Sequence, residues 1–315
     1  MAPMSNQADI VVLGSLNADL VQKVSRIPLP GETLEGGNLE TFGGGKGANQ
    51  AFAAARLSGK AAMIGQVGDD YLGRLLTENL ASAGVDMRAV GLSDQPTGAA
   101  AIWVLPGGEN VIVISPGANA TLSPGLAASR LAMFHGMRYL LCQLETPIET
   151  VERALRLAKA AGAGTILDPA PARTLPQTLL RSVDVLTPNE TETLTLLGSP
   201  GERVETAAQA EQAAARLLEL GVKIVVLKLG RQGCFVSRVG IREHVAGFAV
   251  EAVDTTAAGD TFNGALAVAL AEGESLSSAA RFANAAAALS TTKPEAQSSG
   301  PSRDEVERFV ASTNP

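Results

Sequence analysis

Short apolar runs rich in valine, isoleucine and leucine alternate with helical patterns along most of the chain. Runs of this kind, bounded by polar residues and glycine, are typical of strands buried on both faces. The predicted strands cover 9–15, 61–68, 137–143, 164–168, 182–187 and 223–228. Because buried strands that alternate with helices build parallel sheets, we predict an α/β fold: a doubly wound, mostly parallel central sheet with helices on both faces.

Capping signals mark the ends of several predicted helices. One helix is expected to begin with Thr146 as N-cap and Pro147 in the first helical position, with Glu149 closing a capping box. A second is expected to stop at Gly221 and a third at Gly273, because glycine readily ends a helix.

Two intervals, 16–42 and 96–118, break the alternation of strands and helices. Their prolines, glycines and short alternating runs, such as AAAIWVLPGGENVIVI, predict β-hairpins. We expect these hairpins to form a small lid beside the central sheet. Because the two intervals are separated in sequence, the prediction is one domain spanning 1–315 with the lid inserted in it.

Composition and charge exclude several classes of function. The 315 residues carry a net charge of -7, whereas binding to nucleic acid or an anionic membrane needs a basic face. No apolar run approaches the length of a membrane span, and the N-terminus lacks the pattern of a signal peptide, so we expect a cytoplasmic protein. Cys142 and Cys234 are expected in the core, and His135 and His244 show no metal-like spacing.

Conspicuous polar residues follow the predicted strands. In an open parallel sheet, ligands bind at the carboxyl ends of the strands, so this placement favours an enzyme or another ligand-binding protein. The residues in question are Asn17, Asp19, Glu145, Asp168, Asn189, Glu192 and Gly230.

The segment DTTAAGDTFNGA, which starts at Asp254, combines a loop of small residues with a carboxylate at the start of a helix. The N–H groups of Ala257, Ala258 and Gly259 can bind an anion there, because small side chains let it approach the positive end of the helix. Asp260 can then accept the proton of an attacking hydroxyl, the second requirement of phosphoryl transfer. The alternative is structural: Asp260 favours the helix dipole and Asp254 caps the loop.

The glycine-rich segment GGGKGANQA, residues 43–51, is neither of two common phosphate-binding motifs. It is not a Walker A loop because Lys46 is followed by Gly47, and as a dinucleotide fingerprint it lacks a preceding strand and an acidic partner. Its glycines would let the backbone approach a polyol, with Lys46 and Asn49 as hydrogen-bond donors. A flexible turn is the alternative.

Together these two segments resemble the signatures of the ribokinase-type (PfkB) carbohydrate kinases. The stretches VVLGSLNAD, QLETP, DPAPAR and TPNETE are similar to that family as well, and the resemblance runs from about residue 10 to 310. It implies a ribokinase-like fold and an ATP-dependent kinase that phosphorylates D-ribose at O5. It also implies Mg²⁺ with the nucleotide, K⁺ as a monovalent activator, and a homodimer formed through the lid.

The resemblance also assigns roles to residues. Asp260 matches the catalytic base and the segment 257–260 the anion hole. Ribose would be held by Asn17, Asp19, Gly44, Gly45, Lys46, Asn49, Glu145 and Asp260. ATP and its Mg²⁺ would be held by Asn189, Glu192, Lys228, Gly230, Gly259 and Asn284. The monovalent cation would be held by Asp254, the Thr256 carbonyl, Ser290, Lys293, Glu295 and Ser299.

Some positions depart from the family pattern. Lys228 stands where threonine is frequent, so its ammonium either contacts phosphate or is displaced outward. Asn284 replaces a frequent histidine, and Pro294 with Glu295 alters the cation loop.

Other functions remain open at this stage. They are a kinase for deoxyribose, another sugar or a nucleoside, an inactive sugar sensor, and an NAD-dependent dehydrogenase. A nucleoside kinase is disfavoured, because it should offer an aromatic surface to the nucleobase. Aromatic residues make up only 3% of the chain, and Phe42 and Trp103 are the main candidates for such a surface in the lid.

Overall fold

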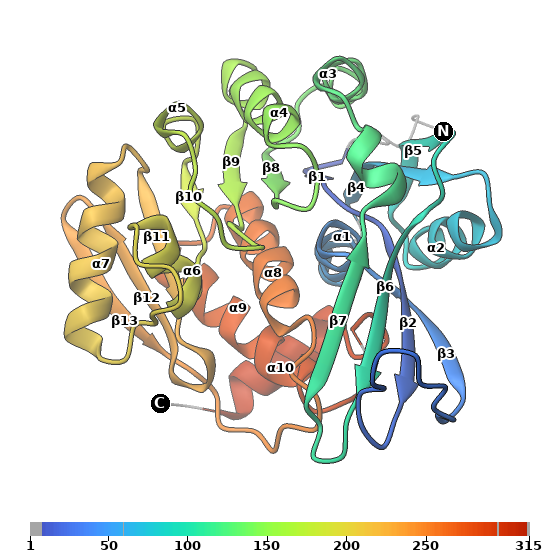
Figure 1. The fold of residues 1–315 in the computed structure, drawn as a ribbon. Helices are drawn as coiled ribbons and strands as arrows, with labels where there is room; N and C mark the ends of the chain where they lie inside the picture. The colour runs from blue at the N-terminus through green and yellow to red at the C-terminus, as the bar shows by residue number, and fades with distance from the viewer. Residues whose placement is uncertain (1–7, 59, 295, 314–315) are drawn as a thin grey trace.

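The fold was analysed in a computed structural model that describes residues 8–58, 60–294 and 296–313. Within these residues, nine strands form one sheet in the order β13-β12-β11-β10-β9-β8-β1-β4-β5 (Figure 1). The strands from β11 to β5 run parallel to their neighbours, whereas β12 and β13 form an antiparallel edge. The predicted doubly wound, mostly parallel α/β fold is confirmed.

The bounds of the central strands agree with most of the predicted ones. The strands are β1 Ile10–Leu13, β4 Ala61–Gly68, β5 Asp86–Ser93, β8 Tyr139–Cys142, β9 Gly164–Leu167, β10 Val185–Leu186, β11 Ile224–Lys228, β12 Gly233–Arg238 and β13 Ile241–Ala246. The strand expected over 182–187 shortens to β10, because Ser182 and Val183 donate their N–H groups to Leu179 and Leu180 and close the preceding helix. The sequence prediction did not include β5, β12 and β13.

Helices cover both faces of the central sheet. They are α1 Lys46–Ser58, α2 Tyr71–Ser82, α3 Pro124–Leu131, α4 Ile148–Ala160, α5 Gln177–Leu180, α6 Glu190–Leu196, α7 Ala207–Glu219, α8 Ala258–Glu272, α9 Leu276–Ser290 and α10 Arg303–Ser312, with 3₁₀ turns at Gly117–Thr121 and Gly230–Gln232. Alternate residues of β1 enter different cores: Val11 and Leu13 pack with α3, α4 and α7, and Ile10 and Val12 pack with α1, α8 and α9. This two-sided burial explains why the strands are continuously apolar.

Both predicted helix stops are confirmed, and the one predicted helix start is wrong. Gly221 and Gly273 follow α7 and α8 with φ of 105° and 90°, the left-handed conformation expected of a helix stop. Thr146 is not an N-cap. Pro147 takes that position with ψ of 133°, no side chain caps the helix, and Glu149 closes no capping box. The fixed φ of proline suits the last extended residue before the helix as well as the first helical one.

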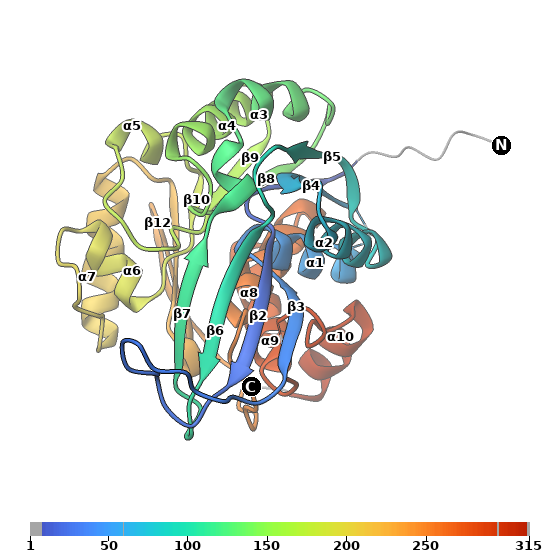
Figure 2. The ribbon, with the colours of Figure 1, turned by 45° about the vertical axis from the view of Figure 1, so that its right-hand side comes forward.

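A smaller sheet, which we call the lid sheet, contains β2 Asn17–Lys23, β3 Leu39–Gly44, β6 Gly98–Val104 and β7 Asn110–Ser115. Its order is β3-β2-β6-β7, so the hairpin of β6 and β7 joins the pair of β2 and β3. These strands come from the two intervals in which hairpins were predicted, with β3 ending slightly later. Figures 1 and 2 show this sheet projecting from the body of the molecule beside α8 and α1.

Other sequence predictions concern single residues and membrane spans. Cys142 and Cys234 are both buried and free, as expected of core residues. His244 makes a hydrogen bond with the carbonyl of Gln232 at 2.9 Å, a structural contact. In the part of the chain that the structure describes, no helix has the length and apolar character needed to cross a bilayer.

Candidate active site

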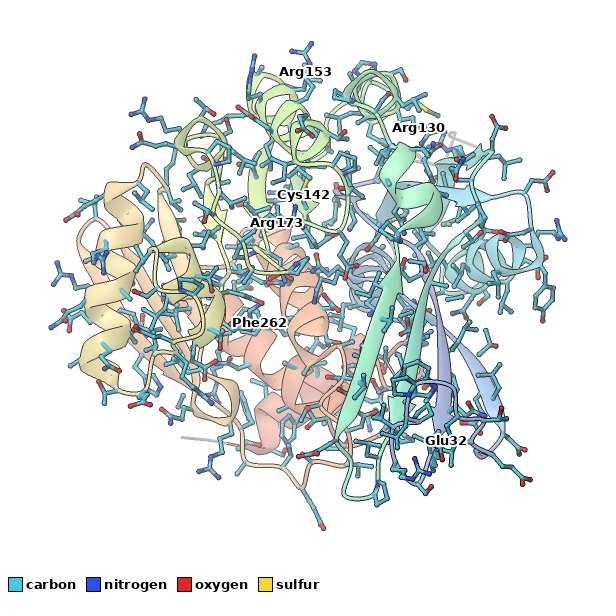
Figure 3. All side chains as sticks on the ribbon, in the orientation of Figure 1. Glu32, Arg130, Cys142, Arg153, Arg173 and Phe262 are labelled. Carbon is cyan, nitrogen blue, oxygen red and sulfur yellow. The ribbon has the colours of Figure 1, made fainter. Side chains whose placement is uncertain are left out.

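Asp260 lies in the first turn of α8, where the sequence motif predicts it, and only 5% of its surface is exposed. Ala257 starts the helix with φ of 58°, a left-handed conformation that turns the loop sharply into α8. In Figure 3 the site can be located from Phe262, two residues beyond Asp260, and from Cys142 at the end of β8. Asp260 is thus a buried carboxylate at the positive end of a helix.

The backbone of the 257–260 segment, where the anion hole is predicted, begins α8. The first N–H groups of a helix have no acceptor within that helix and are free to bind an anion. Here the N–H of Ala258 makes a long turn bond of 3.3 Å to the carbonyl of Thr255. Gly259 adds no side chain, and a Cβ built on it would lie 3.6 Å from Nζ of Lys228. A lysine ammonium therefore stands next to the anion-binding backbone.

Lys228 points into the site. At the end of β11, its Nζ donates to Oδ1 of Asp168 at 2.9 Å, and 13% of its side chain is exposed. Burial alone would lower the pKa of Lys228, but Asp168 and Glu192 raise it above its usual value, so the ammonium stays charged. Outward displacement, one of the two alternatives for this residue, is thereby excluded.

The glycine-rich segment begins α1 and follows a strand. The prediction that no useful strand precedes it is wrong, because β3 ends at Gly44. That strand belongs to the lid sheet and not to the central sheet, so the segment is still not a dinucleotide fingerprint. Gly45 has φ of 88°, and at Gly44 a Cβ would lie 2.2 Å from Oδ2 of Asp19. The absence of a side chain at Gly44 leaves room for the Asp19 carboxylate.

Asn17 and Asp19 follow β1, as predicted, and lie in β2 of the lid sheet. Asn17 is buried, and its Oδ1 accepts a hydrogen bond from Nδ2 of Asn119 at 2.7 Å. Burial, with the negative charges of Glu145 and Asp260, raises the pKa of Asp19 to about 7. The Asp19 carboxyl therefore lies on the lid side of the site, within reach of the charge of Asp260.

Lys46 and Glu145 meet at the start of α1. The backbone N–H of Lys46 donates to Oε2 of Glu145 at 3.1 Å, and the same oxygen accepts from Oγ of Ser15 at 2.5 Å. Asp260, more than any other group, raises the pKa of Lys46, against the opposing effect of burial. The Lys46 ammonium therefore lies in the negative field of Asp260.

Asn49 connects Asp260 with the C-terminal segment. Its Nδ2 donates to Oδ2 of Asp260 at 3.2 Å, and its Oδ1 accepts from Nε2 of Gln297 at 3.1 Å. Gln297 in turn accepts from Nδ2 of Asn79 in α2. The glycine-rich motif and the DTTAAGD motif, far apart in sequence, thus meet at one carboxylate.

Two of the predicted nucleotide residues form a helix cap. Oδ1 of Asn189 accepts from the N–H of Glu192 at 2.8 Å, and Oε2 of Glu192 accepts from the N–H of Asn189 at 2.7 Å, a reciprocal capping box for α6. Glu192 is 9% exposed, and burial raises its pKa. Asn189 also pairs with Lys228 in a parallel bridge, which brings the cap beside the anion-binding turn.

The remaining predicted nucleotide residues lie further along the same edge. Gly230 is exposed and opens the 3₁₀ turn after β11 with φ of 54°. Asn284 in α9 is 6% exposed, and its Nδ2 donates to the carbonyls of Val245 and Ala246 at 3.1 and 3.2 Å. Those bonds tie α9 to β13, a structural use of the amide donors.

The predicted cation residues come from two segments that lie together. Val253 and Asp254 donate their N–H groups to the carbonyl of Thr291 at 2.7 and 3.1 Å, and Oδ1 of Asp254 accepts from the N–H of Thr256 at 2.9 Å. Lys293 is turned to α10, where Nζ lies 3.3 Å from Glu305.

Ser290 and Ser299 are both buried, and each hydroxyl donates to a carbonyl three residues before it in the chain. Glu295 lies outside the described residues. Across the residues that the structure does describe, no group of three or more His, Cys, Asp or Glu side chains is arranged to hold a metal ion.

Several polar residues of the site carry no assigned role in the sequence analysis. Gln50 lies within the quoted glycine-rich motif, and Asp168 and Gln143 each follow a buried strand, which was the available signal. Ser15, Asn119 and Gln297 gave no such signal, because each acts by a hydrogen bond to a residue about a hundred or more positions away.

The family comparisons agree with this geometry. Residues 7–303 match the pfkB family carbohydrate kinase pattern. The chain belongs to the PfkB family of carbohydrate kinases. It is 45% identical over 304 residues to the ribokinase of Haemophilus influenzae, covering 96% of this chain and 98% of the relative.

Two further relatives of the PfkB chain bear on its substrate. A solved structure of Arabidopsis thaliana ribokinase complexed with ribose and ATP aligns with a TM-score of 0.89 and 37% identity, covering 96% of this chain and 99% of that one. A deoxyribokinase of Salmonella typhi is 35% identical over 305 residues, covering 96% and 99%.

The raised pKa of Asp19 leads to a testable effect on stability. Between about pH 4 and pH 7 the native state retains a proton that the unfolded chain has lost, so this group makes the free energy of unfolding fall as pH rises. Asp19→Asn removes the carboxylate, so the free energy of unfolding of the variant should not show this fall. Relative to the wild type, we expect it to rise by on the order of 2 kcal/mol when the pH is changed from 4.5 to 8. Urea unfolding at both pH values measures this difference. The matched control is Asp304→Asn, a substitution at an exposed position. If the free energy of unfolding changes with pH equally in Asp19→Asn and in the wild type, the raised pKa of Asp19 is refuted.

Proposed function

We propose that this PfkB kinase transfers the γ-phosphoryl group of ATP to O5 of D-ribose, giving ribose 5-phosphate and ADP. The observation that carries the proposal is the bond from Asn49 to Asp260, which joins the predicted sugar-binding motif to the predicted phosphate-binding turn at a buried carboxylate. The similarity to ribokinases over nearly the whole chain supports ribose as the sugar. Without Asp260 in this place, an inactive sugar sensor would be the better hypothesis.

The site residues suit a furanose on one side and a triphosphate on the other. Vicinal sugar hydroxyls need acceptors and charged donors close together, and Asp19, Lys46 and Asn49 supply them from the lid sheet and α1. We assign Asn17, Gly44, Gly45 and Glu145 to the same sugar-binding surface. The dehydrogenase alternative is disfavoured, because the glycine-rich segment follows a lid strand and not a strand of the central sheet.

In the proposed reaction Asp260 accepts the proton of the O5 hydroxyl while O5 forms a bond to the γ-phosphorus. The bond from that phosphorus to the β–γ bridging oxygen breaks, and ADP leaves. Burial and the charge of Asp168 raise the pKa of Asp260, while Lys46 and the side-chain amides of Gln50 and Asn49 lower it, and the net effect is a carboxylate more basic than usual. The N–H groups at 257–259 and the Lys228 ammonium would stabilise the charge on the transferring group.

ATP binds as its Mg²⁺ complex in this proposal. Glu192 and Asn189 present oxygen atoms, the ligands that Mg²⁺ prefers, beside Lys228 and the anion-binding turn. The ion would offset the negative charge of the phosphates. Gly230 and Asn284 are assigned to the nucleotide on the resemblance alone.

A monovalent cation is proposed on the loop behind the anion hole. The bonds from Val253 and Asp254 to the Thr291 carbonyl hold the loop 253–256 against the segment that carries Ser290 and Ser299, and carbonyl and carboxylate oxygens are suitable ligands for K⁺. A bound cation would fix the turn in which the N–H groups of Ala257 to Gly259 face the phosphoryl group. The side chain of Lys293 does not fill this site with its own ammonium, since that ammonium is paired with Glu305, and its backbone carbonyl stays among the proposed ligands.

We further propose that 1–315 is one kinase domain in which the lid sheet closes over the sugar, and that two copies associate through the lid. The edge strand β7 leaves Val111, Ile112, Val113 and Ile114 between 37% and 55% exposed. An apolar edge strand of this kind is costly in water and is normally covered. The enzyme would work in the cytoplasm, where ATP is available and cysteines such as Cys142 and Cys234 stay reduced.

The base assignment predicts the outcome of one substitution. Asp260→Asn should lower kcat with ribose by roughly 10² to 10⁴, because it cannot accept the O5 proton, while ribose binding is largely kept. An ADP-release assay gives kcat, and calorimetry gives ribose affinity. The control Glu272→Gln, at the exposed far end of α8, should retain activity. A kcat for Asp260→Asn within tenfold of the wild-type value would eliminate Asp260 as the base. If the wild-type enzyme prefers 2-deoxyribose to ribose, the proposed substrate is wrong and 2-deoxyribose takes its place.

The cation assignment predicts activation by K⁺. In tetramethylammonium buffer, added K⁺ should raise kcat or lower the KM for ribose, and Asp254→Ala should abolish this response while leaving weak basal turnover. Lys293→Met should respond to K⁺ as the wild type does. Equal wild-type rates with and without K⁺ would contradict the proposed site.

The proposed dimer predicts a mass in solution of twice the 32.2 kDa chain mass. Light scattering during gel filtration measures it. The double substitution of Ile112 and Ile114 by lysine should produce monomers, because charged groups cannot be buried in an apolar interface. A concentration-independent monomer mass for the wild type would exclude the dimer.

A further inference from the structure

Gln50 lies at the centre of the buried polar network. It is fully buried in α1, and its Nε2 lies 2.9 Å from Oδ1 of Asp260 and 2.9 Å from Oδ2 of Asp168. A side-chain amide nitrogen carries two hydrogens, so each can be donated to one carboxylate. Gln50 thus stands between two buried carboxylates and donates a hydrogen bond to each of them.

The orientation of this amide is fixed from behind. Nε2 of Gln143, the residue that follows β8, donates to Oε1 of Gln50. If the Gln50 amide were reversed, its oxygen would face the carboxylates of Asp168 and Asp260, and its NH₂ would face that of Gln143. Only one orientation of the Gln50 amide therefore satisfies that amide and both carboxylates, while Oε1 of Gln143 is left buried without a hydrogen-bond partner among the described residues.

Asp168 is held on its other side by Lys228. It is 2% exposed, and its two oxygens are divided between the ammonium of Lys228 and the amide of Gln50. A buried carboxylate is stable only when it is paired and hydrogen-bonded, and Asp168 meets both conditions. The chain of contacts from Lys228 through Asp168 and Gln50 to Asp260 crosses the carboxyl edge of the sheet from β11 to α8.

We propose that Gln50 is a positioning residue for the base: its amide fixes the orientation of Asp260 by bridging it to the buried Asp168–Lys228 pair. The inference rests on the proposed function, since it concerns the base of that reaction. Oδ1 of Asp260 is held by the 2.9 Å bond from Gln50, whereas Oδ2 has the longer 3.2 Å bond from Asn49. Oδ2 is therefore the oxygen that accepts the proton of the sugar hydroxyl.

The first test is Gln50→Met, which keeps the length of the side chain and removes the donors. We expect kcat to fall about 10- to 100-fold, because a misplaced catalytic group loses near-attack geometry, with the KM for ribose and for ATP little changed. The acid limb of the kcat–pH profile should move to higher pH by on the order of one unit, because the carboxylate has lost a donor. The charged groups that act on Asp260 in the folded protein are Lys46 from α1, Asp168 after β9 and Asp19 from β2, and all of them stay in this variant.

The second test should move the same limb in the opposite direction. Asp168→Asn combined with Lys228→Met removes the Asp168 charge, which raises the pKa of Asp260, together with the ammonium that pairs with it, so the acid limb should move to lower pH when ATP is saturating. Opposite shifts in the two variants are not expected from a general loss of stability. If Gln50→Met fails to fold, as judged by circular dichroism, Gln50→Asn takes its place: it keeps a polar amide but is one methylene shorter, so it should lose the bond to Asp260 and move the limb in the same direction.

The matched control is Gln66→Met. Gln66 is equally enclosed, at 4% exposure, but its amide contacts Thr121 and Arg130 and no acidic group. Its acid limb should not move. An unmoved limb in both test variants, while Asp260→Asn is inactive, would overturn the role of Gln50 and leave the proposed function intact. A wild-type protein without sugar kinase activity would instead overturn the proposed function itself.

Discussion

The burial of several carboxylates at one edge of a parallel sheet is the constraint on which this structure depends. Asp19, Glu145, Asp168, Glu192 and Asp260 all lie in or beside the site, and burial raises the pKa of Asp19, Glu192 and Asp260. Charged groups in such a place are stable only with partners, and the partners are the ammonium groups of Lys46 and Lys228 together with a set of side-chain amides. These partners keep buried carboxylates ionised that burial alone would favour in the protonated form. A general base for phosphoryl transfer must be such an ionised carboxylate.

The fold meets this constraint by bringing strand ends and helix starts together. Asp168, Lys228 and Gln143 stand at the carboxyl ends of β9, β11 and β8, Lys46 and Asp260 stand in the first turns of α1 and α8, and Gln50 stands at the start of the second turn of α1. The positive ends of these helices favour the carboxylates, and the same ends favour the phosphates of a nucleotide. One electrostatic arrangement thus serves both stability and binding, which is why the sheet edge carries the site and the opposite edge does not.

Much of this could be predicted from the sequence, for identifiable reasons. The continuous apolar strands predicted the sheet, and the Gly221 and Gly273 stops predicted two helix ends, because both signals are local. The start of α4 was wrong, since Thr146 and Pro147 can each fill the cap position and only tertiary packing decides between them. A hairpin was predicted over 16–42, but the end of β3 at Gly44 was not, because that end depends on pairing with β2 and not on a pattern in its own residues.

The site shows the same division between local and long-range signals. Asp260 and Lys46 were identified from motifs, whereas the roles of Gln50, Asn119 and Gln297 depend on hydrogen bonds to distant parts of the chain that no local pattern encodes. The direction of Lys228 was left open by the sequence and is determined by Asp168, whose own importance is visible only once β9 and β11 lie in one sheet.

The most direct measurement of the central claim is a crystal structure of the protein with ribose, ADP and aluminium fluoride as a mimic of the transferring phosphoryl group. We expect O5 of the sugar at about 3 Å from Oδ2 of Asp260, with Oδ1 still held by Gln50 and the mimic against the 257–259 backbone. A complex in which Asp260 contacts no sugar hydroxyl, or in which its carboxylate has turned away from Gln50, would contradict the account.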